Sequence, residues 1–178
     1  MGQVGEPHFD MRRISLKDGI INQSITSICT GKKEELWIGT LNGLYSCDGF
    51  RITRYDQAGF IHQQLPDHQI TDLEMLDDCG VILVCTRKGT CAIDPITRIN
   101  ISETELGAGD GLLGKCTQIE KSRLGFYFAY SPGRMYRVNI TGFRQLTIQP
   151  WFEVQAGKDV KMVADQMQGD AVWLLPHE

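Results

Sequence analysis

The stretch LWIGTLNGLY, residues 36–45, decides the fold of this chain. It consists of two apolar runs joined by an Asn-Gly pair, and Asn-Gly favours a tight hairpin turn because both residues accept positive φ angles. A short apolar run bounded by turn residues is typical of a β-strand that is covered on both faces. We therefore expect a β-hairpin with strands near residues 35–40 and 43–47.

The same hairpin pattern recurs along the chain. Thr40 and Gly43 have counterparts 46 residues later in Thr86 and Gly89. A weaker third copy carries its hairpin glycine at Gly133, 44 residues after Gly89, and a fourth, incomplete copy begins near residue 160. Repeats with periods of roughly 20 to 50 residues are typical of solenoids, propellers and other repeat arrays.

Each repeat contains short apolar runs separated by turn residues. In the first repeat these runs predict strands near residues 24–29, 35–40, 43–47 and 50–55. A helical repeat is not favoured, since the apolar run over 81–84 lacks a 3.6-residue periodicity. Four antiparallel strands per repeat are typical of β-propeller blades, which pack face to face around a central channel.

The prediction is therefore an all-β fold, a partial β-propeller of four-stranded antiparallel blades. At about 45 residues per blade, the 178 residues hold about three and a half blades, whereas a closed ring generally has roughly four to eight. An open arc leaves bare sheet edges, so we expect self-association through them, or contacts with remaining blades or a neighbouring propeller. Within one partial propeller over 1–178, the predicted elements are an isolated outer strand at 9–15, blade 1 at 20–55, blade 2 at 69–102, blade 3 at 112–148 and an incomplete blade 4 at 158–178.

Composition and charge exclude several classes of protein. The chain has 42% hydrophobic and 22% charged residues, as an ordinary globular protein does. Its net charge of −4 argues against a nucleic-acid partner, which would need a clustered excess of Lys and Arg. No apolar run approaches the roughly 18 residues of a membrane span, and the first residues lack a signal peptide's apolar stretch. Direct membrane insertion of this segment is therefore not expected.

The six cysteines contain no Cys-x-x-Cys pair and no zinc-ligand spacing with histidine. We expect most of them to be buried thiols. Cys85 and Cys91 flank the predicted turn at 87–89 and could face each other across it, so a disulfide between them stays open as an alternative.

The repeat resembles a known family. Residues 16–20, 25–28, 36–45 and 48–50 are similar to the two-component regulator propeller repeat, whose Leu-Trp-Ile-Gly-Thr-x-x-Gly-Leu core is nearly complete over 36–44. The likeness is strong over residues 9–55 and extends by spacing alone over roughly 8–175. Such repeats occur in the periplasmic sensor region of hybrid two-component sensor histidine kinases of Bacteroides-type bacteria.

The resemblance implies a function. This chain would be a non-enzymatic, extracytoplasmic (periplasmic) sensor fragment that needs no cofactor. It would bind, or help to bind, an oligosaccharide-derived signal and relay it to a cytoplasmic histidine kinase absent from this chain. One alternative is a structural or protein-interaction module without a small ligand. Another is a propeller enzyme such as a lyase or hydrolase.

Propeller geometry predicts where a ligand would bind. Loops that join the second and third strands of a blade, and loops that join successive blades, emerge together at one channel mouth. The candidate ligand residues in these loops are Asn42, His62, His68, Arg87, Lys88, Tyr130 and Arg134. The residues predicted to maintain the repeat itself are Trp37, Thr40, Gly43, Thr86, Gly89, Gly133 and Trp173.

Several of these residues have a structural explanation. Trp37 and Trp173 occupy the same apolar second strand in different repeats, where a tryptophan would pack between sheets rather than stack on a sugar. Thr40 and Thr86 are expected to form hydrogen bonds at the strand end.

Other motifs do not indicate a cofactor site or a metal site. GDGLLG at 109–114 matches the dinucleotide fingerprint, but the residue 20 positions after Gly114 is Arg134 rather than an acid. His62 and His68 bracket a polar loop, where a histidine pair is more often solvated than metal-bound. We therefore predict no catalytic residues and no metal site.

Overall fold

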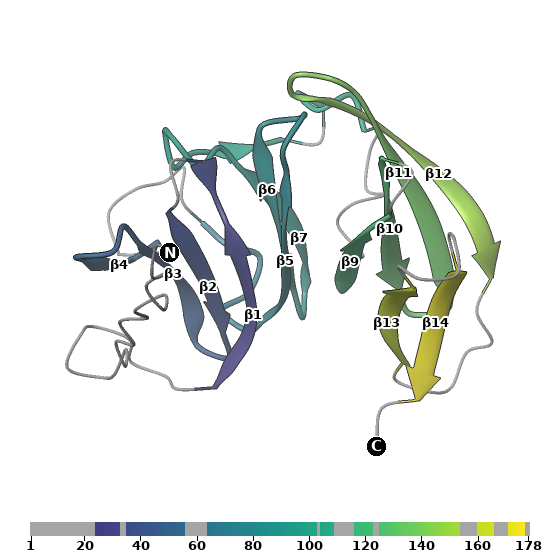
Figure 1. Ribbon diagram of the computed structural model, residues 1–178, viewed down its shortest axis with the longest axis horizontal. Helices are drawn as coiled ribbons and strands as arrows, with labels where there is room; N and C mark the ends of the chain where they lie inside the picture. Colours follow the sequence, from purple (N-terminus) through teal and green to yellow (C-terminus); the bar gives the residue numbers. More distant parts are fainter. Residues whose placement is uncertain are drawn as a thin grey trace, which may run out of the picture.

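The computed structural model describes residues 24–32, 35–55, 64–102, 104–108, 116–122, 125–153, 160–165 and 171–176. Within these residues the chain forms three four-stranded antiparallel sheets and one two-stranded sheet (Figure 1). Each sheet is a meander in which neighbouring strands are consecutive in the sequence. We call the four sheets blades 1 to 4.

The strand bounds follow the apolar runs of the sequence. Blade 1 contains β1 (Ile25–Thr30), β2 (Leu36–Thr40), β3 (Gly43–Cys47) and β4 (Ile52–Arg54). Blade 2 contains β5 (Ile70–Leu76), β6 (Val81–Thr86), β7 (Gly89–Ile93) and β8 (Asn100–Ile101). Blade 3 contains β9 (Gln118–Lys121), β10 (Phe126–Ser131), β11 (Arg134–Gly142) and β12 (Gln145–Glu153). Blade 4 contains β13 (Val160–Asp165) and β14 (Ala171–Pro176).

The blades pack face to face. Trp37 and Leu44 of blade 1 belong to one apolar cluster with Ile70 and Ile82 of blade 2. A second cluster joins the other face of blade 2 to blade 3, and Leu83 and Tyr127 belong to it. Strand β6 is buried along its whole length, as a strand covered on both faces should be.

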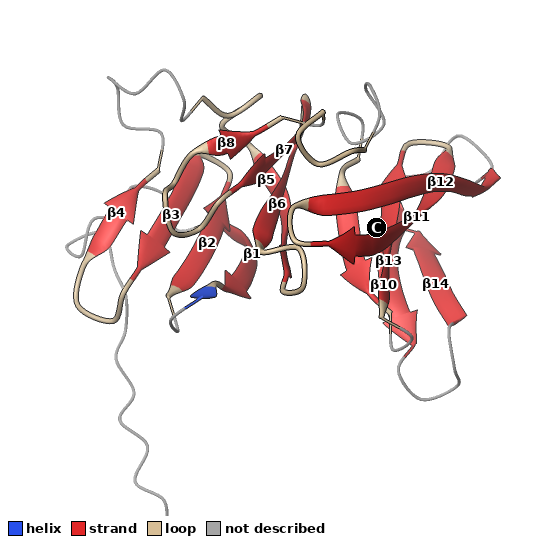
Figure 2. Ribbon diagram, turned by 90° about the horizontal axis from the view of Figure 1, so that it is seen from above, coloured by secondary structure: helices blue, strands red, loops and turns tan. Residues whose placement is uncertain are grey.

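The first strands of successive blades lie side by side. β1 contacts β5, β5 contacts β9, and β9 contacts β13, and Figure 2 shows the sheets arranged as an arc. Sheets that pack face to face with their first strands innermost have the arrangement of propeller blades. The predicted all-β class and four-stranded antiparallel blades are confirmed.

Blade 3 differs from the others in its outer hairpin. β11 and β12 are nine residues each, against three to five for the corresponding strands β3 and β4. Their turn arches toward blade 2 (Figure 1), where the amide N–H of Arg144 donates to the carbonyl of Cys79 at 2.9 Å. β12 runs to Glu153, past the blade boundary that the sequence places at 148.

The structure excludes the alternative of a disulfide between Cys85 and Cys91. The ladder between β6 and β7 pairs Val84 with Cys91 and Cys85 with Thr90. Because directly opposed residues share a face, Cys85 and Cys91 lie on opposite faces of blade 2. No disulfide joins them, and all six cysteines are free. The predicted strand at 9–15 lies outside the described residues.

Candidate functional site

The polar loops predicted to bind a ligand meet at one end of blades 1 and 2. The connection between these blades touches both neighbouring hairpin turns. The amide N–H of Gly43 donates to the carbonyl of His68 at 2.8 Å, and the amide N–H of Arg87 donates to the carbonyl of Gln69 at 3.0 Å. Asn42 is exposed in the first of these turns. The backbone thereby brings Asn42, His68 and Arg87 to the same end, which we call the polar end.

The β6–β7 turn places two cations at the polar end. Arg87 Nη1 donates to Gln69 Oε1 at 3.3 Å. Lys88 Nζ lies 3.8 Å from Asp67 Oδ2, and the Lys88 side chain is 74% exposed. A guanidinium and an ammonium on one turn offer donors that suit a carboxylate or a hydroxyl-rich ligand. Both groups are reachable from solvent, and each has only a loosely held partner.

Two buried threonines hold the turns that carry these groups. Thr40 Oγ1 donates to the carbonyl of Gly43 at 2.9 Å, and Thr86 Oγ1 donates to the carbonyl of Gly89 at 2.6 Å. Both threonines are fully buried. Their hydroxyls therefore close the hairpins and are not offered to a ligand.

Blade 3 adds less to the polar end than the sequence predicts. The Tyr130 side chain is 6% exposed, so its ring has little surface on which a sugar could stack. Arg134 is half-exposed, and its Nη2 lies 3.1 Å from Glu153 Oε1. Gly133 lies in the turn between these two residues, with φ of 86°. His62 lies outside the described residues.

Trp37, the tryptophan of the second strand in blade 1, offers no exposed surface on which a sugar could stack. Trp37 is completely buried, and its ring centroid lies 5.9 Å from that of Tyr55. This agrees with packing between sheets rather than contact with a sugar. Trp173 lies in β14, paired with Val163 of β13.

A second group of polar side chains joins the innermost strands. Ser27 Oγ of β1 donates to Asp72 Oδ1 of β5 at 2.9 Å and accepts the amide N–H of Leu73 at 3.2 Å. On its other side, Asp72 Oδ2 accepts the amide N–H of Ile119 in β9 at 2.9 Å. One carboxylate therefore links the first strands of three successive blades.

Glu74 lies two residues after Asp72 in β5, on the face that packs against blade 3. Burial raises its pKa from 4.5 to about 7, and the carboxylates of Glu120, Asp72 and Asp77 add to the shift while Lys121 opposes it. Lys121 Nζ is itself 3.1 Å from Asp77 Oδ2. Glu74 therefore holds or releases a proton near neutral pH, at the inner edge between blades 2 and 3.

Sequence reasoning missed this inner group, although a signal for it is present. The first strands of the three blades begin Ile-Thr-Ser-Ile, Ile-Thr-Asp-Leu and Cys-Thr-Gln-Ile. The third residue of each is polar: Ser27, Asp72 and Gln118. A polar residue repeated at one position of the repeat indicates a shared role, and two of these three, Ser27 and Asp72, join neighbouring first strands.

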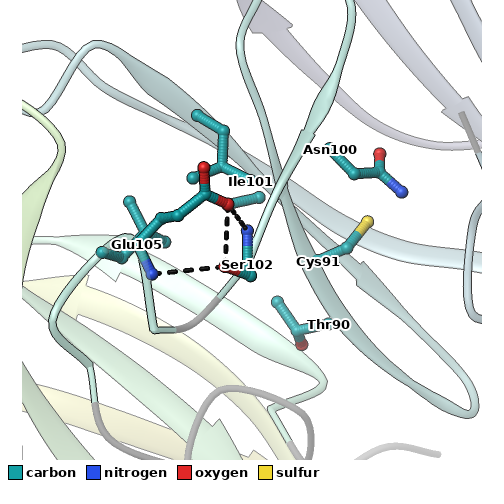
Figure 3. Close-up of a pocket in the computed structure, with 8 residues that line it drawn as sticks. Thr90, Cys91, Asn100, Ile101, Ser102 and Glu105 are labelled. Carbon is teal, nitrogen blue, oxygen red and sulfur yellow. Dashed lines mark hydrogen bonds between the residues drawn. The ribbon is translucent and has the colours of Figure 1, made fainter. Parts of the chain in front are cut away.

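A recess of about 330 Å³ opens beside β7, where the two-residue strand β8 leaves part of its edge uncovered (Figure 3). Two of its polar residues bond to each other: Ser102 Oγ donates to Glu105 Oε2 at 2.7 Å, and the Glu105 N–H donates to Ser102 Oγ at 3.2 Å. Asn100 Nδ2 in its lining donates to the carbonyl of Gln64. Burial raises the pKa of the Cys91 thiol in its wall to about 12, so this sulfur is not a ready nucleophile. The recess is therefore a weaker candidate than the polar end.

The described residues offer neither a cluster of metal ligands nor a helix suited to a membrane. Among the described residues, no group of three or more His, Cys, Asp or Glu side chains is placed to hold a metal ion. No helix in that part of the chain is long and apolar enough to cross a membrane.

Comparison with known proteins supports the fold. No protein-family model and no curated protein sequence matches the chain. Among solved structures, the chain is similar to one named as the extracellular domain of the hybrid two-component system BT3049 from B. thetaiotaomicron, with a TM-score of 0.59 and 18% identity. That match covers 92% of this chain but 29% of the other, so this chain spans less than a third of its length. Virginiamycin B lyase from Staphylococcus aureus is also similar, with a TM-score of 0.54 and 14% identity over 86% of this chain and 49% of the enzyme. At these identities the likeness concerns the fold alone.

Proposed function

We propose that this chain is part of the extracytoplasmic sensor propeller of a hybrid two-component system. Its polar end would bind, or help to bind, a carbohydrate-derived signal, and the signal would pass to a cytoplasmic histidine kinase. The observation that carries the proposal is the likeness to the BT3049 extracellular domain over 92% of the chain. The resemblance of residues 36–45 to the two-component regulator repeat supports it independently.

The polar end supports a sugar acid as the ligand. Arg87 and Lys88 bring two positive charges to one turn, while Asn42 and Gln69 add amide groups that can bond to hydroxyls. A guanidinium binds a carboxylate through two parallel hydrogen bonds, which a neutral sugar cannot match. We therefore expect uronic-acid oligosaccharides to bind more tightly than neutral ones.

Isothermal titration calorimetry tests this proposal directly. The 178-residue chain is titrated with a panel of neutral and uronic-acid oligosaccharides. We expect heat from at least one uronic-acid oligosaccharide. The double variant Arg87→Ala with Lys88→Ala should weaken that binding by roughly tenfold or more, since it removes two charged contacts worth about 1.4 kcal/mol or more together.

Arg51→Ala is the matched control, because Arg51 is an exposed arginine in the β3–β4 turn, away from the polar end. It should leave the heat unchanged. If no oligosaccharide binds, the sensing role is wrong for this chain and the interaction-module alternative is favoured.

The likeness to a lyase makes an enzymatic alternative testable in the same samples. Chromatography of each oligosaccharide after incubation would detect cleavage. A new product that disappears on substitution of a polar-end residue would contradict the non-enzymatic proposal. We expect none.

A further inference from the structure

Large apolar side chains stand exposed at the tips of the outer hairpins. Phe50 in the β3–β4 turn is 92% exposed, Ile96 in the β7–β8 turn is 61% exposed, and Phe143 in the β11–β12 turn is 64% exposed. Single exposed apolar residues are common on proteins and need no explanation. These three, however, occupy the same turn of three successive blades. We call them the apolar tips.

Two of the tips are built by the same local structure. Phe50 and Ile96 are 46 residues apart, the period of the repeat, and each follows an aspartate by two residues. Asp48 Oδ1 accepts the amide N–H of Phe50 at 2.9 Å, and Asp94 Oδ1 accepts the amide N–H of Ile96 at 2.7 Å. Such a turn fixes the backbone beneath the side chain. The two tips are thus displayed on rigid, repeated supports.

The third tip is fixed by contacts with its neighbours. Phe143 follows Ile96 by 47 residues. Its ring lies so close to Gly80 that a Cβ atom there would be 2.6 Å from the ring, and Lys32 Nζ lies 5.5 Å from the ring centroid. The adjacent Arg144 N–H donates to the carbonyl of Cys79. Phe143 is therefore held against the β5–β6 turn of blade 2, with most of its ring still exposed.

The topology places all three tips at one end. The first strands of successive blades lie side by side, and each blade is an antiparallel meander, so equivalent turns emerge together. The tips lie in the turns between third and fourth strands, whereas the polar end is made by turns between second and third strands. The apolar tips therefore lie at the end opposite to Asn42 and Lys88, and Figure 1 shows the β11–β12 turn at its upper edge.

Charged groups of both signs lie near the tips, and several of them pair within the chain. Arg98 Nη2 lies 2.6 Å from Glu35 Oε1, and Arg144 pairs with Asp94. These mixed charges, which also include Lys32 and Arg51, leave little attraction for an anionic membrane or a nucleic acid. They equally leave little repulsion between two copies of this end, although the chain as a whole carries a net charge of −4.

We propose that the apolar tips form a contact surface for a second copy of this chain, with the two tip-bearing ends facing each other. Two sets of tips supply six large apolar side chains, and each of the four phenylalanines can bury up to about 150 to 250 Å². That is sufficient for the apolar centre of an interface of roughly 1,200 to 2,000 Å². Because the turns are rigid before contact, little conformational entropy is lost on association. This surface is separate from the ligand-binding polar end.

Sedimentation velocity over a range of protein concentrations tests the proposal. We expect a reversible monomer–dimer equilibrium in the 178-residue chain that persists in about 1 M salt, because screening weakens ionic but not apolar contacts. The triple variant Phe50→Ser, Ile96→Ser and Phe143→Ser should raise the dissociation constant by tenfold or more. Its far-UV circular dichroism should not change, since the three side chains are exposed.

Ile28→Ser is the matched control. Ile28 is an isoleucine 52% exposed on the face of β1, away from the tips, and its loss should leave the dimer intact. A chain that stays monomeric at all concentrations would overturn the proposal. So would dimers that Ile28→Ser abolishes and the triple variant does not, because association would then use an open blade face. Flotation with phosphatidylcholine vesicles that depends on the tips would assign them to a membrane instead.

Discussion

The interface between blades 1 and 2 and the interface between blades 2 and 3 rely on different contacts. Between blades 1 and 2 the contact is an apolar cluster centred on Trp37, where β2 comes so close that a Cβ atom on Gly39 would be 2.6 Å from the Ile70 side chain. Between blades 2 and 3 the cluster is larger and includes Cys79, Cys85 and Cys116, while Glu74 lies at its inner edge. The long β11–β12 hairpin also crosses this second interface.

The difference shows how a repeat fold tolerates a degenerate repeat. Blades 1 and 2 carry the closest copies of the repeat. Their contact combines close apolar packing with the Ser27–Asp72 and Tyr55–Asn100 hydrogen bonds and the Arg98–Glu35 ion pair. Blade 3 has lost most of the repeat residues, and its hairpin supplies extra contacts outside the pattern: the N–H of Leu146 donates to the carbonyl of Leu106, and Arg144 pairs with Asp94. Asp72 contributes to both interfaces through Ser27 and Ile119. Both interfaces therefore combine packing with polar contacts. Packing on Trp37 should contribute most to the first, whereas the second also depends on the contacts of the long β11–β12 hairpin.

The largest effect is expected from Trp37→Ala. The substitution removes a fully buried side chain from the centre of the first interface and leaves a cavity. Large-to-small substitutions of this kind lower the free energy of unfolding by about 3 to 5 kcal/mol. Urea denaturation followed by circular dichroism measures the loss.

Trp151→Ala serves as the control for Trp37→Ala. Trp151 is 46% exposed and stacks on Phe128 at a centroid distance of 4.8 Å. Trp151→Ala should lower the free energy of unfolding clearly less than Trp37→Ala does. Equal losses would contradict the view that packing on Trp37 dominates the first interface.

A smaller, pH-dependent effect is expected from Glu74→Gln. The pKa of Glu74 rises from 4.5 to about 7 on folding. Between these values the folded chain binds a proton that the unfolded chain has released, so wild-type stability falls as pH rises from about 4.5 to 7 and levels off above that range. After allowance for solvent screening of this half-buried group, the fall is about 1 to 2 kcal/mol.

Glutamine remains neutral at every pH, so the stability of the variant should not fall between about pH 4.5 and 7. The variant should therefore be more stable than wild type at pH 8. Thermal unfolding at a series of pH values measures both effects. Glu153→Gln, which alters an exposed carboxylate, should keep the wild-type profile. If Glu74→Gln keeps it too, Glu74 is not the group responsible.

The sequence predicts the local pattern better than the contacts between blades. The strands and turn at 36–45 follow from one apolar run, an Asn-Gly pair and a second run, all of which act over short distances. The buried position of Trp37 also follows, because the strand that carries it is apolar throughout. Of the candidate site, Asn42, His68 and Arg87 come together because propeller topology alone brings their turns to one end.

The features that the sequence does not predict depend on contacts between residues distant in sequence. Tyr130 belongs to a polar-looking turn, yet its ring is covered by packing that no local pattern encodes. Whether Cys85 and Cys91 face each other stays open in the sequence, because the turn fixes the register of the ladder, and a shift of one residue reverses a side chain's face. The raised pKa of Glu74 arises from burial and from carboxylates in and directly after its own strand and on β9 of the next blade.

The smallest effect is expected from Arg144→Ala. Arg144 donates to Asp94 across the second interface, but its side chain is 40% exposed, and Asp94 keeps the N–H donors of Ile96 and Thr97 when the guanidinium is removed. The free energy of unfolding should therefore fall by only about 1 kcal/mol. A double-mutant cycle with Asp94→Asn separates the pair from other losses, and the coupling should shrink in about 1 M salt. Arg87→Ala, at the polar end, should change stability by less. A coupling near zero would mean that the hairpin is held on blade 2 by its backbone contacts with Cys79 and Leu106 rather than by charge.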